Sequence, residues 1–360
     1  MRSIPTPSDR CRAGCESRPR AIRATALLAA ALVAAIVLAA LVAVATGSAA
    51  IEPETVLRMI LRRTIAPGLA TDWSTAAERI VLELRLPRVV LGLMVGAGLA
   101  VTGLVLQTLT RNPLADPYLF GVSAGASVGA VLVITQLGDL IGPATLPVAA
   151  FAGAMLALVA VIGIAGPIAA AGRERLVLAG VAVSFVLMAV TNVLIFLGDQ
   201  RAAQAVVFWM LGGLGLARWD LLPIPTIAVV AALGLLWLHA RRLDALLLGD
   251  DTATTLGVNV ARLRLVLFVL CSILTGALVA LAGSIGFIGL MVPHMARVLV
   301  GVRHALLVPI TALCGALMVV VVDILARVLL DPQELPLGII TGSVGGAYVI
   351  WLIRCHRLGT

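Results

Sequence analysis

Residues 85–137 contain an arginine-flanked proline, a long apolar run, a polar turn and a second apolar run. The two runs cover residues 89–109 and 119–137, and the turn between them contains Pro113 and Pro117. An apolar run of about 20 residues can cross a bilayer as a helix. Polar groups and helix breakers at membrane depth are tolerated only where protein or a water-filled path surrounds them. The stretch therefore predicts a membrane hairpin and indicates a pathway beside it.

The composition agrees with a chain whose main solvent is lipid. Hydrophobic residues make up 61% and charged residues only 12%, with a mean hydropathy of +1.12. Soluble domains carry about 25% charged residues. The predicted fold class is therefore all-α, a polytopic membrane protein.

The hydropathy pattern predicts about ten membrane-spanning helices. They are expected over residues 24–45, 89–109, 119–137, 146–169, 176–197, 222–239, 263–282, 285–296, 305–329 and 337–353. Residues 1–20 are expected to form a disordered cytoplasmic tail, and residues 21–360 the transmembrane domain. Amphipathic residues 53–63 and 73–84 are expected to form surface helices outside the membrane.

The first apolar run resembles a signal peptide, because arginines precede it and small residues follow at 47–50. At about 22 residues it is longer than the ~7–15 residues of a signal core. A retained helix is the prediction, and a cleaved signal is the alternative.

The arginines predict the orientation. With ten crossings and the N-terminus inside, the inner segments carry 17 of the 26 arginines, and the chain has no lysine. Because cytoplasmic loops are enriched in basic residues, both termini are expected in the cytoplasm.

Several classes of function are excluded by what the sequence lacks. Without lysine, a standard Gly-x4-Gly-Lys phosphate loop is impossible, so the chain cannot hydrolyse ATP itself. The five cysteines have no zinc-type spacing, and no nucleophile–base pair is visible, so no cofactor, metal or enzymatic activity is expected. Arginines scattered between apolar runs, with 4% aromatic residues, argue against nucleic-acid binding.

A set of motifs occurs in a characteristic order. They lie at residues 85–88, 103–107, 111–117, 121–126, 178–181, 209–213, 248–257, 283–297 and 334–341. Together, over residues 24–356, they resemble the permease subunit of the ABC importers that take up ferric siderophores, haem and cobalamin. The resemblance implies a ten-helix subunit of the bacterial cytoplasmic (inner) membrane.

The resemblance also implies partners. Two ABC ATPase subunits would lie on the cytoplasmic side, and an extracytoplasmic substrate-binding protein would dock outside. A second permease subunit, either another copy or a paralogue, would complete the dimer. A ferric siderophore is the favoured cargo, with haem and cobalamin as alternatives.

The cytoplasmic loop 241–262 resembles the family's ATPase-coupling segment. The coupling residues it implies are Gly249, Asp250, Asp251, Ala253 and Gly257, although an acid longer than Asp is usual at the start of this motif. The alternative is an ordinary solvated helix–loop.

Three arginines are predicted on the outside, where the charge bias runs against them. The resemblance implies that Arg85, Arg88 and Arg327 receive carboxylates of the binding protein, and the planar guanidinium suits such bidentate pairing. Snorkelling toward lipid headgroups is the alternative. Asp323 lies four residues before Arg327, a spacing that favours a helical ion pair over a proton relay.

The predicted pathway residues fall into two groups. Polar and small residues are expected to line or support the path; they are Gln107, Asn112, Gly121, Ser123 and Gly125. Arg173 and Glu174 lie where the family narrows the path on the cytoplasmic side. Because cobalamin relatives have small hydroxyl residues there, a plain helix-connecting turn is an equal alternative to a gate.

An ion-coupled secondary transporter is the alternative function. Such proteins usually show inverted repeats and charged or broken helices at the membrane midplane. This chain offers one deep acid, Asp323, and no clear repeat.

Overall fold

A computed structural model describes residues 7–47, 51–65, 72–166 and 173–355 of the chain. Within these ranges it gives no side-chain placement for residues 7–22, Thr64 or Arg173. The expectation of a disordered tail falls mostly on residues without placed side chains, and it stays a prediction.

The chain folds into long and short helices joined by turns. The long ones are α1 (Pro7–Ala45), α4 (Leu86–Thr110), α6 (Thr145–Ala165), α7 (Arg173–Leu197), α9 (Pro223–Leu238), α12 (Val260–Ala282), α14 (His304–Val328) and α15 (Leu337–Arg354). The shorter ones are α2 (Pro53–Thr64), α3 (Thr75–Arg79), α5 (Val122–Leu132), α8 (Gln200–Met210), α10 (Ala240–Leu248), α11 (Asp250–Thr255) and α13 (Ile288–Val300). Single turns of other helix types are η1 (Ile80–Arg85), η2 (Pro117–Phe120) and η3 (Val133–Leu137).

The helices confirm the all-α membrane fold. In the described residues, seven are long and apolar enough to cross a membrane, or eight if α9 and α10, bent by 60°, form one span. Two shorter apolar helices cover Val122–Leu137 and Ile288–Val300. Each of the ten predicted runs coincides with one of these helices. The number of crossings and the side of the termini stay predictions.

One predicted boundary is confirmed and another is wrong. The first run, predicted over residues 24–45, coincides with the candidate span Arg23–Ala45, although its helix α1 begins earlier, at Pro7. Residues 73–84 do not form a separate surface helix, because α3, η1 and α4 are one continuous helix over Thr75–Thr110. Pro87 has no N–H to donate and crowds the carbonyl one turn before it, and the π-helical η1 lies directly ahead of it. The helix thus continues beyond the apolar run.

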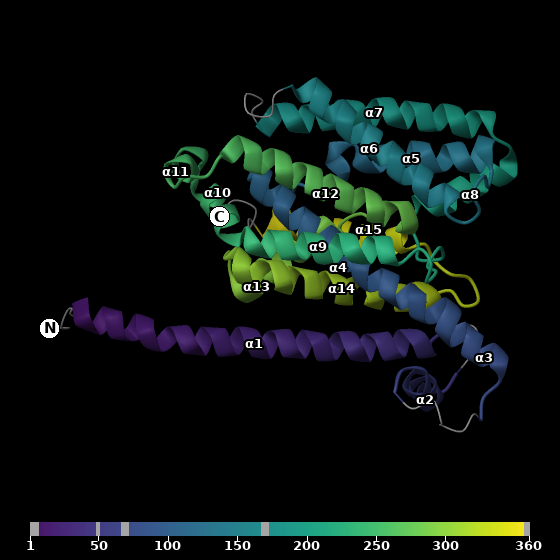
Figure 1. The fold of residues 1–360 in the computed structure, drawn as a ribbon, viewed down its shortest axis with the longest axis horizontal. Helices are drawn as coiled ribbons and strands as arrows, with labels where there is room; N and C mark the ends of the chain where they lie inside the picture. Colours follow the sequence, from purple (N-terminus) through teal and green to yellow (C-terminus); the bar gives the residue numbers. More distant parts are fainter. Residues whose placement is uncertain (1–6, 48–50, 66–71, 167–172, 356–360) are drawn as a thin grey trace.

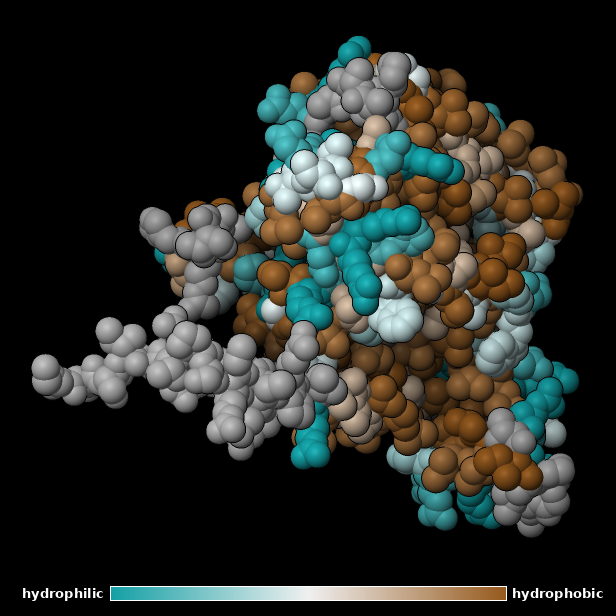
Figure 2. Space-filling model, turned by 60° about the vertical axis from the view of Figure 1, so that its left-hand side comes forward, coloured by the Kyte–Doolittle hydropathy of each residue, from teal (hydrophilic) through white to brown (hydrophobic). Residues whose placement is uncertain are grey.

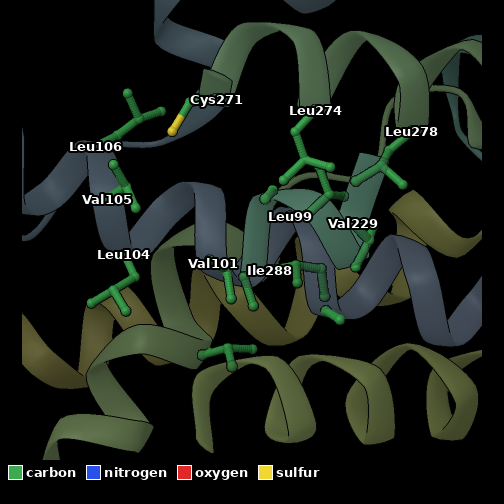
Figure 3. Packing of buried hydrophobic residues seen from close by; sticks show 14 of the residues in the cluster. Leu99, Val101, Leu104, Val105, Leu106, Val229, Cys271, Leu274, Leu278 and Ile288 are labelled. Atoms are coloured by element: carbon green, nitrogen blue, oxygen red, sulfur yellow. The ribbon is translucent and has the colours of Figure 1, made fainter. Parts of the chain in front are cut away.

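α4 lies at the centre of the bundle. In its most apolar stretch 83% of the residues are buried, against 17% for α7 and 22% for α15. Leu99, Val101 and Leu104 of α4 face neighbours on several sides, among them Leu274 and Leu278 of α12 (Figure 3). A central helix of this kind is a scaffold, whereas α7 and α15 lie at its edge.

Glycines allow α4 to approach its neighbours closely. A Cβ placed on Gly96 would collide with the backbone of Gly315 in α14, and one on Gly103 with that of Gly289 in α13. Small residues at such crossings let helix backbones pack directly, which is a common way to hold membrane helices together.

The two ends of the bundle differ in content. α10 and α11 lie at one end, where α1 begins and α15 ends, and α2 and α3 lie at the other (Figure 1). We call these the inner and outer ends, following the predicted orientation. Turned toward the inner end, the molecule shows hydrophilic residues in the middle of its face and hydrophobic residues along its flank (Figure 2).

Candidate functional site

The predicted coupling loop contains two short helices at the inner end. Gly249 separates α10 from α11 with φ +126°, and Gly257 follows α11 with φ +81°. Residues with a side chain rarely adopt such φ values, so glycine is strongly favoured at both turns. The chain therefore presents a compact helix–turn–helix where a long flexible loop could have been.

Asp250 joins three segments of the inner end. Its Oδ1 accepts a hydrogen bond from Arg111 Nη2 at 3.0 Å, and Arg264 Nη2 reaches both its oxygens, at 2.8 and 2.7 Å. Arg111, at the end of α4 with φ +49°, also donates to the Leu246 carbonyl of α10 at 3.0 and 2.7 Å. The acid at the start of α11 is thereby fixed to the ends of α4 and α12.

This geometry divides the five predicted coupling residues. Asp250 turns toward the bundle with its side chain still 36% exposed, and Ala253 is fully buried. Asp251 and Gly257 are exposed. Three leucines that sequence reasoning missed are exposed beside them: Leu247 (41%), Leu248 (67%) and Leu256 (62%).

A second carboxylate holds α10 to the bundle. Asp244 Oδ1 accepts from the backbone N–H of His304 at 2.9 Å and lies 2.7 Å from its Nδ1. The other ring nitrogen lies 3.0 Å from Thr108 Oγ1 in α4. Sequence reasoning missed this chain of contacts; the only signal was a histidine at the start of an apolar run. It connects α10 to the beginning of α14 and the end of α4.

Gln107 is buried and supports the fold. Its side chain is 3% exposed, and its Nε2 donates to the carbonyls of Gly289 at 3.0 Å and Leu290 at 3.3 Å. It therefore holds α4 against the first turn of α13. Of the predicted alternatives, lining or supporting the path, this geometry favours support.

The glycines of the hairpin also serve packing. Gly121 has φ +79° and caps the start of α5 directly after η2. Gly125 lies directly against Gly153 of α6, leaving no room for a Cβ. Asn112 is exposed in the turn after α4, and its Oδ1 accepts from Leu114 N at 2.9 Å.

Ser123 lines a cavity between α5, α7 and α8. The cavity has a volume of 370 Å³, and its wall includes Ser127 and Ser184 together with Phe185 and Met188. The hydroxyls of Ser127 and Ser184 donate to carbonyls of their own helices, at 3.1 and 2.8 Å. The wall is consequently apolar with weakly polar spots.

The predicted gate lies at the beginning of α7. Glu174 is exposed there, whereas the side chain of Arg173 and the residues just before it lie outside the described part of the chain. The gate stays a prediction.

The outer arginines are held inside the protein. Arg85 Nη1 donates to the carbonyls of Val44 at 2.9 Å and Ala45 at 3.0 Å, and Arg327 Nη1 to those of Ala43 at 2.9 Å and Thr46 at 2.8 Å. The last carbonyls of a helix lack intrahelical donors and attract cations, so the end of α1 is a natural acceptor. Each arginine is 7% exposed.

In this conformation Arg85 and Arg327 bond the end of α1 and expose little of their side chains, and docking through them stays a prediction. Arg88 differs: its Nε lies 2.9 Å from Asp323 Oδ1, and its Nη1 lies 2.8 Å from Glu334 Oε2, whose side chain is 55% exposed. Docking through Arg88 stays a prediction.

Asp323 is an ion-pair residue, as its spacing predicted. It lies 2.8 Å from Arg327 in addition to its contact with Arg88. An acid between two arginines is a poor proton carrier, which weakens the secondary-transporter alternative. The described residues contain no group of three or more His, Cys, Asp or Glu side chains placed to hold a metal.

Comparison with known proteins places this architecture in a family. The model of the FecCD transport family matches residues 25–355. The chain belongs to the FecCD transport family. It is 41% identical to the hemin transport permease HmuU of Yersinia pestis over 294 residues, 80% of this chain and 88% of the relative. It is 38% identical to the Fe(3+) dicitrate permease FecC of Escherichia coli over 297 residues, 81% of this chain and 87% of the relative.

Further relatives agree. The cobalamin permease BtuC of Halobacterium salinarum is 42% identical over 278 residues, 77% of this chain and 74% of the relative. An inward-facing metal-chelate type ABC transporter has a similar fold, with a TM-score of 0.78 and 28% identity over 91% of this chain and 98% of that one. This FecCD protein is thus a multi-pass permease subunit of an ABC importer in the cytoplasmic (inner) membrane.

Proposed function

We propose that this permease forms half of the translocation path for a metal chelate or related cofactor, with a second permease subunit forming the other half. The cargo is a ferric siderophore, haem or cobalamin delivered by a substrate-binding protein. Two ATPase subunits at the inner end supply the energy. The named relatives, which carry hemin, cobalamin and iron dicitrate, support this class of cargo.

The observation that carries the proposal is the fixation of α11 by Asp250. An ATPase that moves α10 and α11 moves Arg111 and Arg264 with them, because both arginines hold the same carboxylate. Arg111 ends α4 and Arg264 belongs to α12, so the movement reaches the central scaffold. Coupling between distant sites needs such an element with defined contacts at both ends.

We infer that the ATPase contact is the exposed surface of α10 and α11. Leu247, Leu248 and Leu256 offer apolar anchors, and Asp251 offers a charge at their edge. These leucines are exposed in the single subunit at an end that faces water. Apolar clusters of this kind mark interaction sites, so we infer that a partner subunit covers them in the assembled transporter.

The cavity beside Ser123 is proposed as part of the path. A carrier that releases its cargo cannot bind it tightly, and a wall of apolar side chains with internally bonded hydroxyls meets that need. At the outer end, Arg88 and the exposed Glu334 are proposed as the point where the binding protein contacts the rim.

A labelling experiment tests the path in the assembled transporter. In a variant lacking the native cysteines, Ser123→Cys should react with a water-soluble thiol reagent in at least one nucleotide state. Ser272→Cys in α12 is the matched control, because Ser272 is also buried but lines no described cavity. Equal protection of both cysteines in every state, in a transporter whose ATPase subunits remain bound, would contradict the assignment.

A further inference from the structure

A hollow at the inner end lies between the end of α9, α10 and the beginning of α12. Its volume is 420 Å³, and its wall contains His239, Arg242, Asn259, Arg262 and Val266. None of its lining residues is acidic. The hollow is separate from the Ser123 cavity. It shares Arg242 of α10 and Gly257 with the predicted coupling loop, but none of the leucines proposed for the ATPase contact lines it.

The positive charges of this hollow are not neutralised from within. Among the described residues, neither Arg242 nor Arg262 has a side-chain ion pair or hydrogen bond. The neighbouring acids are engaged elsewhere, Asp244 with His304 and Asp250 with its two arginines. Two free guanidinium groups at one concave site favour an anion.

The polar atoms around the arginines are arranged for the same kind of ligand. His239 Nδ1 lies 2.9 Å from the Leu235 carbonyl, which leaves Nε2 for a ligand. Asn259 Oδ1 accepts from Arg262 N at 3.0 Å and caps the 23-residue helix α12, whose positive end points into this region. The arginine charges, the hydrogen-bond donors and the dipole of α12 therefore all favour a bound anion.

The hollow opens onto an apolar surface. Val266 is 51% exposed at its edge, and on α9 Trp237 (58%) and Leu238 (72%) are exposed beside His239. Tryptophan is enriched where membrane meets water. A ligand here meets charge at one end and lipid-like surface at the other.

We propose that the hollow binds the phosphate of an anionic phospholipid from the inner leaflet, with its acyl chains along the apolar surface onto which the hollow opens. Arginine forks bind phosphate in a bidentate way, and basic pockets between membrane helices on the cytoplasmic side are suited to lipid headgroups. Free phosphate shares the headgroup chemistry but makes no use of the apolar surface. The lipid would tie the first turn of α12, and so Arg264 and Asp250, to the membrane surface.

Native mass spectrometry of the purified full chain in neutral detergent tests the proposal. The probes are phosphatidylglycerol and phosphatidylcholine with identical acyl chains. Wild-type protein should retain phosphatidylglycerol preferentially. Arg242→Gln with Arg262→Gln should lower that retention by at least about fivefold, the expected contribution of one basic side chain near an anionic surface. Arg241→Gln is the matched control, because Arg241 is exposed on the same helix but does not line the hollow.

Each other outcome overturns the proposal. An equal loss of phosphatidylglycerol retention in Arg241→Gln would mean that general surface charge, and not the hollow, holds the lipid. Displacement of the lipid by millimolar inorganic phosphate means a free-anion site. If the double variant keeps its lipid but loses ATPase association, the hollow belongs to a protein interface. The wild-type preference needs no variant, so its absence is decisive even if the double variant fails to fold.

Discussion

Arginines are clustered at both ends of the bundle, and the two clusters are built differently. At the outer end, Arg85 and Arg327 are buried and bond the final carbonyls of α1. At the inner end, Arg111 and Arg264 share the half-exposed carboxylate of Asp250, whose side chain is 36% exposed. Because the outer cluster is buried, breaking its contacts destabilises the fold. The inner ion pairs are partly exposed, so breaking them costs little free energy, and they can rearrange when α10 and α11 move.

The largest effect on stability is expected from Arg327→Gln. The change leaves Asp323, whose side chain is 2% exposed, with Arg88 as its remaining ion-pair partner, and it removes the Arg327 donor from the carbonyls of Ala43 and Thr46. Removing one member of a buried pair costs about 3–5 kcal/mol of the free energy of unfolding. Thermal unfolding in detergent, followed by size-exclusion chromatography, measures the loss.

The control for this change is Arg218→Gln. Arg218 pairs with Asp220 at the same end, but both side chains are more than half exposed, so its melting temperature should not move. Equal losses in the two variants would mean that burial does not separate the clusters.

A smaller loss is expected from Arg88→Gln, because Asp323 keeps Arg327. Loss of hydrogen bonds to a charged group costs about 1–3 kcal/mol. Arg88→Gln combined with Asp323→Asn should lose less than the sum of the single changes, since the two residues share one interaction. Additive losses would show that the contact contributes nothing.

A pH effect of a few degrees in melting temperature is expected from Asp116, which lies in the turn after α4. Burial raises the pKa of its carboxyl to about 6, and a hydrogen bond from Tyr118 N only partly opposes this. With the folded-state pKa raised above the ordinary 3.8, its contribution to stability is fully present below pH 4 and is lost as pH rises through 6. Between pH 7 and pH 5 the wild type should therefore gain more than Asp116→Asn does. Identical dependence of melting temperature on pH in wild type and Asp116→Asn would show that Asp116 does not cause the effect.

The smallest effect on stability, about 1 kcal/mol or less, is expected from Asp250→Asn, because the pair is substantially exposed. Its effect on coupling should be large. In reconstituted transporter, Asp250→Asn should raise the number of ATP molecules hydrolysed per cargo molecule delivered several-fold. The control is Asp251→Asn, which should behave nearly as wild type, because Asp251 is exposed and bonds no arginine in the described residues. If both variants stay coupled, the Asp250 contacts are only structural.

Local patterns predicted a large part of this fold. Apolar runs of membrane length located the helices, and the four-residue spacing of Asp323 and Arg327 identified their ion pair, because both depend on neighbours in sequence. The continuation of α4 back to Thr75 was missed, because an amphipathic stretch reads as a surface helix even when it only extends a spanning helix into water.

The candidate site was predicted less well than the fold. Arg85 was read as an outward group, and nothing in its neighbourhood indicates that the carbonyls of Val44 and Ala45 lie within reach. Asp250 and Asp251 are adjacent and chemically identical, yet only the first faces Arg111 and Arg264. Which of two neighbouring acids turns inward depends on the packing of α4 and α12, and a sequence pattern holds no record of that.

The bonds to the end of α1 also set an order of assembly during synthesis. Arg85 follows Val44 by 41 residues, whereas Arg327 follows Ala43 by 284. At about 5–20 residues per second, the first contact is available within seconds and the second only after tens of seconds. During synthesis the end of α1 can therefore be bonded only by Arg85 at first. The contact from Arg327 forms after nearly the whole chain has been made, when α14 packs against α1.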